Sequence, residues 1–99
     1  MGHPLQSEQE KKRKAKGRED EQRWEHIAGS VISATRQDLD MTQEDLAAKL
    51  GWTRDAVSNL ENGRRHIRVS HLIVIAKKGF RMEPDVLLKR ILRWREGVV

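Results

Sequence analysis

The chain has 99 residues, of which 36% are hydrophobic and 4% aromatic, so we expect one small domain with a modest core. The absence of cysteine excludes disulfides and thiolate metal sites. No apolar run approaches the roughly 20 residues of a membrane span, and no signal-peptide core is present, so we expect a soluble, cytoplasmic protein without a membrane partner. The net charge of +5 favours a polyanionic partner.

Residues 1 to 21 contain almost no apolar side chains after Leu5, so they are predicted to form a disordered arm. Two interpretations of its basic block stay open. In the first interpretation, the block contacts DNA phosphates and releases their counterions. In the second, it is a solvated tail, and neighbouring carboxylates partly offset its positive charge. The block consists of Lys11, Lys12, Arg13, Lys14, Lys16 and Arg18.

A first helix is predicted from residue 22 to about residue 38. Its apolar residues recur at the three- and four-residue spacing of one helix face: Trp24, Ile27, Ala28, Val31 and Ala34. No segment shows the sustained two-residue alternation of β-branched and aromatic residues that is typical of strands. The predicted fold class is therefore all-α.

A second, short helix is predicted from residue 43 to residue 50. Thr42 is suited to cap its first turn, and Asp45 is placed three residues later, where its carboxylate can bond to the amide of Thr42. Apolar residues at one-turn spacing form the inward face: Leu46, Ala47 and Leu50.

Gly51 and Thr53 predict a sharp turn into a third helix that spans residues 53 to 62. Gly51 follows the last apolar residue of the second helix, where a left-handed backbone conformation ends a helix. Thr53 is a second capping residue, and Val57 and Leu60 then form one apolar edge. Two short helices are therefore expected to meet at one tight turn.

Asn62 and Gly63 end the third helix, and a basic loop with Arg64, Arg65, His66 and Arg68 follows. The loop is either a phosphate contact or an ordinary exposed connection, and its position directly after the third helix favours phosphate. Ser70 is suited to cap a fourth helix, which Gly79 is expected to end. The inward face of this helix comprises Leu72, Ile75 and Ala76, with Ile73 beside it.

A fifth helix is predicted to begin at Pro84, because proline suits the first turn of a helix. Leu87, Ile91 and Trp94 recur at helical spacing and are expected to face the core. Leu88 and Leu92 form a second apolar row, which either completes the core or faces a partner. The folded domain is thus expected to span residues 22 to 96, followed by a tail over residues 97 to 99.

The segment QEDLAAKLGWTRDAVSNLEN, residues 43 to 62, places the small residue Ala47 where two steeply crossed helices touch, and Gly51 at their turn. In this spacing it resembles the helix-turn-helix of the phage-repressor and Cro-like family, also called the xenobiotic-response-element family. The resemblance covers roughly residues 22 to 92 and is densest in MTQEDLAAKLGWTRDAVSNLENGRR and IAK. It implies a five-helix DNA-binding domain. Two departures are Asp40, where members usually carry Gly, and one extra residue around Gly79 to Arg81.

The resemblance further implies an ion pair between Arg36, at the end of the first helix, and Glu61 of the LEN segment. The major groove of DNA admits one helix, whose N-terminal turn meets base edges, so base-reading roles are expected for Arg54, Asp55, Ser58 and Asn59. The usage of the family, and the affinity of helix N-terminal amides for anions, imply phosphate or positioning roles for Thr42, Gln43, Thr53, Asn62, Arg64, Arg65 and Arg68.

These assignments predict a small transcriptional regulator, a repressor, that binds double-stranded DNA sequence-specifically and is associated with the nucleoid. One reading helix covers too few base pairs for useful selectivity, so a homodimer on DNA is expected. The C-terminal helix supplies a candidate interface in Leu88 and Leu92. Its polar rim would comprise Arg90, Arg93 and Arg95.

Other chemistry finds little support in the sequence. The four histidines (His3, His26, His66 and His71) lack ligand-like spacing, and no phosphate-binding glycine loop or nucleophile signature is present, so no metal, cofactor, small-molecule ligand or enzymatic activity is expected. Three tryptophans are predicted to be core residues rather than base-stacking platforms: Trp24, Trp52 and Trp94.

An alternative function belongs to another class. The same scaffold can hold a protein partner, as in antitoxins or co-regulators, while the basic arm binds RNA or DNA non-specifically, because a fold does not determine a function. The polar, partly basic face of residues 53 to 65 suits a DNA groove better than an apolar partner. The sequence leaves a phage repressor, an antitoxin and a restriction-system controller open.

Overall fold

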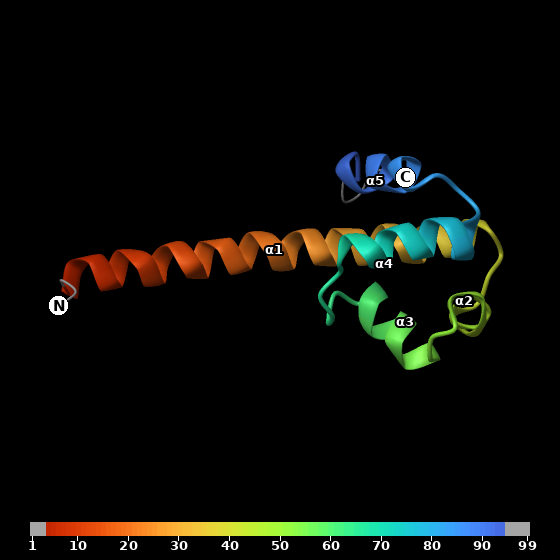
Figure 1. Cartoon of the computed structure of the whole chain (residues 1–99), viewed down its shortest axis with the longest axis horizontal. Coiled ribbons are helices and arrows are strands. Elements are labelled where there is room, and N and C mark those ends of the chain that lie inside the picture. Colours follow the sequence, from red (N-terminus) through yellow and green to blue (C-terminus); the bar gives the residue numbers. More distant parts are fainter. Residues whose placement is uncertain (1–3, 95–99) are drawn as a thin grey trace.

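The computed structural model describes the backbone of residues 4–94 and the side chains of residues 18–94. The elements are α1 (Pro4–Asp38), α2 (Gln43–Leu50), α3 (Arg54–Glu61), α4 (Val69–Val74), the π-helical turn η1 (Ile75–Phe80) and α5 (Pro84–Leu92). The prediction of an all-α domain with a helix-turn-helix is confirmed. Figure 1 shows α2 and α3 on one side of α1 and α5 on the other side.

The core lies where the C-terminal half of α1 meets the other helices. Every described element except α4 contributes fully buried side chains, and among the largest are Ile32, Leu46, Leu60, Ile75 and Leu87. Burying apolar surface of this kind is the main favourable contribution to folding. Helices α2 and α3 are therefore fixed in place by one shared core.

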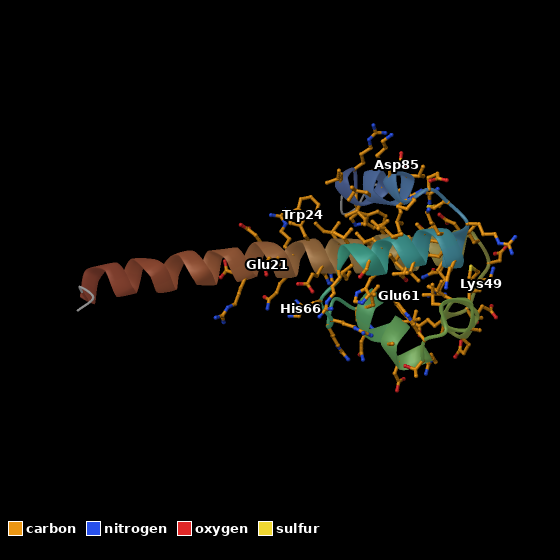
Figure 2. The ribbon with its side chains drawn as sticks, viewed as in Figure 1. Glu21, Trp24, Lys49, Glu61, His66 and Asp85 are labelled. Carbon is orange, nitrogen blue, oxygen red and sulfur yellow. The ribbon has the colours of Figure 1, made fainter. Side chains whose placement is uncertain are left out.

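Two of the three tryptophans are wrongly predicted as core residues. Trp24 is 48% exposed and Trp94 is 37% exposed, whereas Trp52 is half-buried and packs against the core. Trp24 belongs to the helical stripe of α1, but it precedes the part of α1 that the other helices cover (Figure 2). Trp94 follows the end of α5 at Leu92, so it no longer shares the inward face of that helix.

Residues 4 to 21 of the predicted arm lie in α1, which runs from Pro4 to Asp38. This part of the chain is rich in Glu, Gln, Lys and Arg, which favour helix even without apolar packing. Figure 1 shows the first half of α1 extending away from the other helices. Residues 1–3 and the predicted tail 97–99 lie outside the described part of the chain.

The fourth helix begins and ends differently from the prediction. It starts at Val69, so Arg68, and not Ser70, occupies the capping position. The chain then continues through η1 to Phe80, and Gly79 lies inside this turn. A Cβ on Gly79 would lie 2.7 Å from Cδ1 of Leu46. Gly79 therefore allows α2 to approach closely, instead of ending the helix.

Both departures from the family pattern have a clear structural outcome. Asp40, where family members usually carry Gly, adopts the left-handed conformation with φ of 55°, which Asp tolerates better than most residues. The extra residue around Gly79 to Arg81 coincides with η1, whose wider turn holds one residue more than an α-helical turn. Arg81 then leaves the helix in a left-handed conformation with φ of 52°.

The fifth helix begins with Pro84 at its first turn, as predicted. Leu87 and Ile91 are buried, whereas Leu88 and Leu92 are 45% and 59% exposed. The second leucine row therefore does not complete the core of the single chain. In the described part of the chain, no helix is long and apolar enough to span a membrane.

Gly29 provides a test of how α1 packs against the end of α3. A Cβ on Gly29 would collide with the carbonyl oxygen of Leu60 and lie 2.7 Å from that of Glu61. Gly→Ala in a helix normally stabilises, but here we expect Gly29→Ala to lower the free energy of unfolding by about 1–3 kcal/mol, because backbone must move. Urea denaturation measures this, with Gln37→Ala at an exposed position of α1 as control. A Gly29→Ala variant more stable than the parent would contradict the packing.

Candidate nucleic-acid interface

The start of α2 is fixed by a reciprocal cap. The amide of Thr42 donates to Oδ2 of Asp45 at 2.9 Å, and the amide of Asp45 donates to Oγ1 of Thr42 at 3.0 Å. The bond from the Thr42 amide, followed by the Thr42 side chain, lowers the pKa of the Asp45 carboxyl. The predicted capping box is therefore present, and it fixes the residue at which α2 begins.

The turn between α2 and α3 has the predicted geometry. Gly51 adopts the left-handed conformation with φ of 69°, and Oγ1 of Thr53 accepts a hydrogen bond from the amide of Ala56 at 3.1 Å. Val57 and Leu60 bury one side of α3. On the opposite side, Arg54, Asp55 and Asn59 are exposed, and Ser58 is partly exposed. The four predicted base-reading residues thus share one accessible face.

Arg36 and Glu61, the two charges implied to pair, join the end of α1 to the end of α3. Nε of Arg36 donates to Oε2 of Glu61 at 2.8 Å, and Nη2 donates to Oε1 at 3.1 Å. Both residues are buried, with relative exposures of 9% and 7%. The bidentate geometry fixes direction as well as distance, so the pair sets how α3 projects from α1.

Arg54, at the first turn of α3, forms a second ion pair. Its Nε lies 3.0 Å from Oε1 of Glu44 on α2, and both side chains are more than half exposed. An exposed pair of this kind contributes little to stability. Among the described residues the terminal amino groups of Arg54 form no hydrogen bond, so they stay available for a bidentate contact with an acceptor pair.

Apart from the two capping residues, Thr42 and Thr53, the residues assigned to phosphate or positioning roles divide into two groups. Gln43 and Asn62 are partly engaged: Nε2 of Gln43 donates to Glu61 at 3.1 Å, and Nδ2 of Asn62 donates to the Ser58 carbonyl at 2.9 Å. Nδ2 of Asn62 also donates to Oγ of Ser58 at 3.4 Å, whereas the Gln43 amide keeps one further N–H for another acceptor. The second group is exposed on the loop after α3 and comprises Arg64, Arg65 and Arg68.

Sequence reasoning missed the contacts that hold this loop. Nδ1 of His66 lies 3.1 Å from Oε1 of Glu25 on α1. The guanidinium carbon of Arg65 lies 5.8 Å from the centre of the Trp52 ring. These partners are far apart in the sequence, so no local spacing pattern indicates them.

Among the residues described, no three His, Cys, Asp or Glu side chains are grouped as metal ligands would be. His3 lies outside the described residues. The side chains of the basic block from Lys11 to Lys16 also lie outside them, and Arg18 is exposed on α1.

Comparison with known proteins identifies the fold of this site. Residues 32–79 match the Helix-turn-helix family model HTH_3. Among solved structures, a mutant of the Restriction-Modification Controller Protein C.Esp1396I matches with a TM-score of 0.65 and 28% sequence identity, over 71% of this chain and 87% of that chain. A search of curated proteins gives no match.

The two ion pairs allow a matched test of what orients α3. Glu61→Ala leaves the buried Arg36 guanidinium unpaired, so we expect it to lower the free energy of unfolding by roughly 3–5 kcal/mol. Glu44→Ala removes only the exposed pair and should change this free energy by less than about 1 kcal/mol. Urea denaturation followed by circular dichroism measures both. Equal effects of the two substitutions would show that the buried pair is not a constraint.

Proposed function

We propose that this protein, whose residues 32–79 are a helix-turn-helix domain of the phage-repressor and Cro-like family, binds double-stranded DNA sequence-specifically and represses transcription. Regulation of transcription through DNA binding is the function that this domain type performs. The observation that carries the finer proposal is the exposed polar face of α3, bordered on one side by the start of α2 and on the other by the basic loop.

The exposed face of α3 has side chains suited to base edges. Arg54 can donate two bonds to guanine, Asn59 can form a donor and acceptor pair with adenine, and Asp55 can accept from cytosine. The Ser58 hydroxyl can either donate a hydrogen bond to a base edge or accept one from it. Thr42, Gln43, Thr53 and the loop arginines border this face, where the phosphates that flank a major groove would lie.

The neighbour among solved structures supports a regulatory role, since its name describes a controller protein of a restriction-modification system. A controller of this kind is one of the regulators that the sequence left open. We infer the same class of role for this chain. The DNA sequence that it recognises would be identified by selection from random duplexes.

Substitutions on α3 and in the loop should have different effects on binding to the selected duplex. Arg54→Ala or Asn59→Ala should reduce the binding free energy by about 1–3 kcal/mol and relax the preference at one base position. Arg64→Ala should weaken binding to all DNA sequences alike and reduce the slope of log K against log salt concentration by about one. Competition titrations at several salt concentrations measure both. Equal losses for every sequence in all three variants would contradict the base-reading assignments.

The alternative, a protein-interaction module, predicts the opposite result in the same experiment. In that case a selected duplex would bind no better than bulk DNA, and α3 substitutions would not alter any base preference. The exposed, charged face of α3 favours the DNA-binding function, because protein interfaces are depleted in charged residues at their centre.

We further propose a homodimer through α5. Leu88, Leu92 and Trp24 border an apolar groove of about 260 Å³ between α1, α4 and α5. Figure 2 shows Trp24 projecting from α1 toward the side on which α5 lies. A second copy would cover this surface and double the DNA contacts through two half-sites.

A charge placed in this groove should prevent the dimer. We expect Leu92→Glu to give a monomer and to weaken binding to a duplex with two half-sites, because a carboxylate would lose its hydration in the interface. Val86→Glu, at an exposed position of α5 outside the groove, is the control. Sedimentation with and without the duplex gives the readout. A parent protein that binds such a duplex strictly one-to-one would leave the dimer unsupported.

A further inference from the structure

A hollow of about 280 Å³ lies between the last two turns of α1 and the end of α5. Buried Val31 and partly buried Ala34 give it an apolar floor, and Trp94 adds an aromatic wall. Three exposed, charged side chains also line it: Asp38, Arg90 and Arg93. The hollow therefore combines apolar surface with charges of both signs.

The hollow is separate from the surfaces that the proposed function uses. It has no lining residue in common with the apolar groove beside α5. Arg90 lies about 200° around α5 from Leu88 and Leu92, because successive residues of an α-helix are about 100° apart. Figure 1 shows α5 on the side of α1 opposite to α2 and α3. A small molecule in the hollow would thus leave both the leucine row and the exposed face of α3 accessible.

Arg90 is oriented in the hollow by a buried hydroxyl group. Its Nη1 donates to Oγ1 of Thr35 at 3.3 Å, and Thr35 is buried. Among the described residues this is the hydrogen bond that Arg90 forms, so its Nε and Nη2 stay available. These two nitrogens can bind a carboxylate through two parallel bonds, as those of Arg36 do with Glu61. No local spacing pattern indicates the site, since Thr35 and Arg90 are 55 residues apart in the sequence.

The opposite charges that line the hollow do not pair with one another. Among the described residues, no ion pair joins Asp38 to Arg90 or Arg93. Asp38 is the last residue of α1, where the helix dipole favours a positive charge. A ligand ammonium group would therefore be attracted both by the Asp38 carboxylate and by the end of α1. A ligand carboxylate would be attracted by the two arginines.

We infer that this hollow binds a free α-amino acid with an apolar side chain. Such a molecule carries a carboxylate and an ammonium group on one carbon atom, so it matches a hollow that is lined by both signs of charge. Arg90 binds the carboxylate, with Arg93 as a second positive charge, and Asp38 binds the ammonium group. The apolar side chain lies against Val31 and Trp94. A ligand with only one sign of charge would leave one side of the hollow unpaired.

The affinity follows from the exposure of the charged side chains. Water screens such charges, so each contributes little, and we expect a dissociation constant on the order of 0.1–1 mM. The inference goes beyond the proposed function and does not rest on it, because no lining residue belongs to α3 or to the loop that follows it.

Titration of the full chain with L-leucine, followed by NMR of the tryptophan indole N–H groups, tests the site. The three resonances report on three places, because Trp94 lines the hollow, Trp24 lines the apolar groove and Trp52 lies beside α3. We expect a saturable shift of the Trp94 resonance alone. A shift of the Trp24 resonance in its place, or no saturable shift up to about 20 mM, would overturn the inference.

Analogues of leucine test each recognised group on the parent protein, without any effect on folding. L-leucinamide lacks the carboxylate, 4-methylpentanoate lacks the ammonium group, and glycine lacks the apolar side chain. Each should bind roughly 10-fold or more weakly than L-leucine. An analogue that binds as tightly as L-leucine would show that the missing group is not recognised and would overturn the assignment of an apolar α-amino acid.

Variants of the charged residues connect each ligand group to its partner. Arg90→Gln should weaken the binding of L-leucine roughly 10-fold but leave that of L-leucinamide unchanged, because the amide has no carboxylate to lose. Asp38→Asn should likewise weaken L-leucine but not 4-methylpentanoate. Lys89→Gln and Asp20→Asn are matched controls on α5 and α1, since both positions are exposed and neither lines the hollow. Equal losses in these controls would reduce the effect to general charge attraction and would overturn the site.

Discussion

The buried Arg36–Glu61 pair is the interaction on which the geometry of this domain depends. Arg36 binds Glu61 through two nitrogens, and its Nη1 also donates to the carbonyl oxygen of Met41 at 2.6 Å. Oε1 of Glu61 accepts a further bond from Gln43 of α2. One guanidinium therefore connects the end of α1, the loop before α2, and α3. Gln43, the first residue of α2, joins the same network through Glu61.

This network has a directional effect that apolar packing lacks. The core resists separation of the helices, but apolar contacts tolerate small rotations better than a bidentate ion pair does. Gly29 adds a second constraint, because it brings the backbone of α1 against the last carbonyls of α3. Together they hold the exposed face of α3 in one orientation. Arg54 lies on that face, and its exposed pair with Glu44 of α2 leaves it free to change partners.

The sequence predicted features that depend on neighbouring residues and missed those that depend on distant ones. The Thr42–Asp45 cap, the left-handed Gly51 and the Thr53 cap follow from local backbone chemistry, and all three are confirmed. The role of Gly79 depends on a close approach by Leu46, which no local pattern shows. Trp24 was misplaced for the related reason that a helical stripe does not reveal how far its partners extend. The Trp52–Arg65 contact likewise needs the fold before it can be identified.

The charged and apolar surfaces of this domain are separated by α1. The α2–α3 unit lies on one side of α1, whereas α5 lies on the other (Figure 1). The exposed face of α3 is polar, and the groove beside α5 is lined mainly by apolar side chains. A partner on the groove would therefore leave α3 accessible. DNA binding and self-association then need not compete for surface, and each half of a dimer could use its own α3. The C-terminal half of α1 thus separates the surface proposed for DNA from the surface proposed for a second copy.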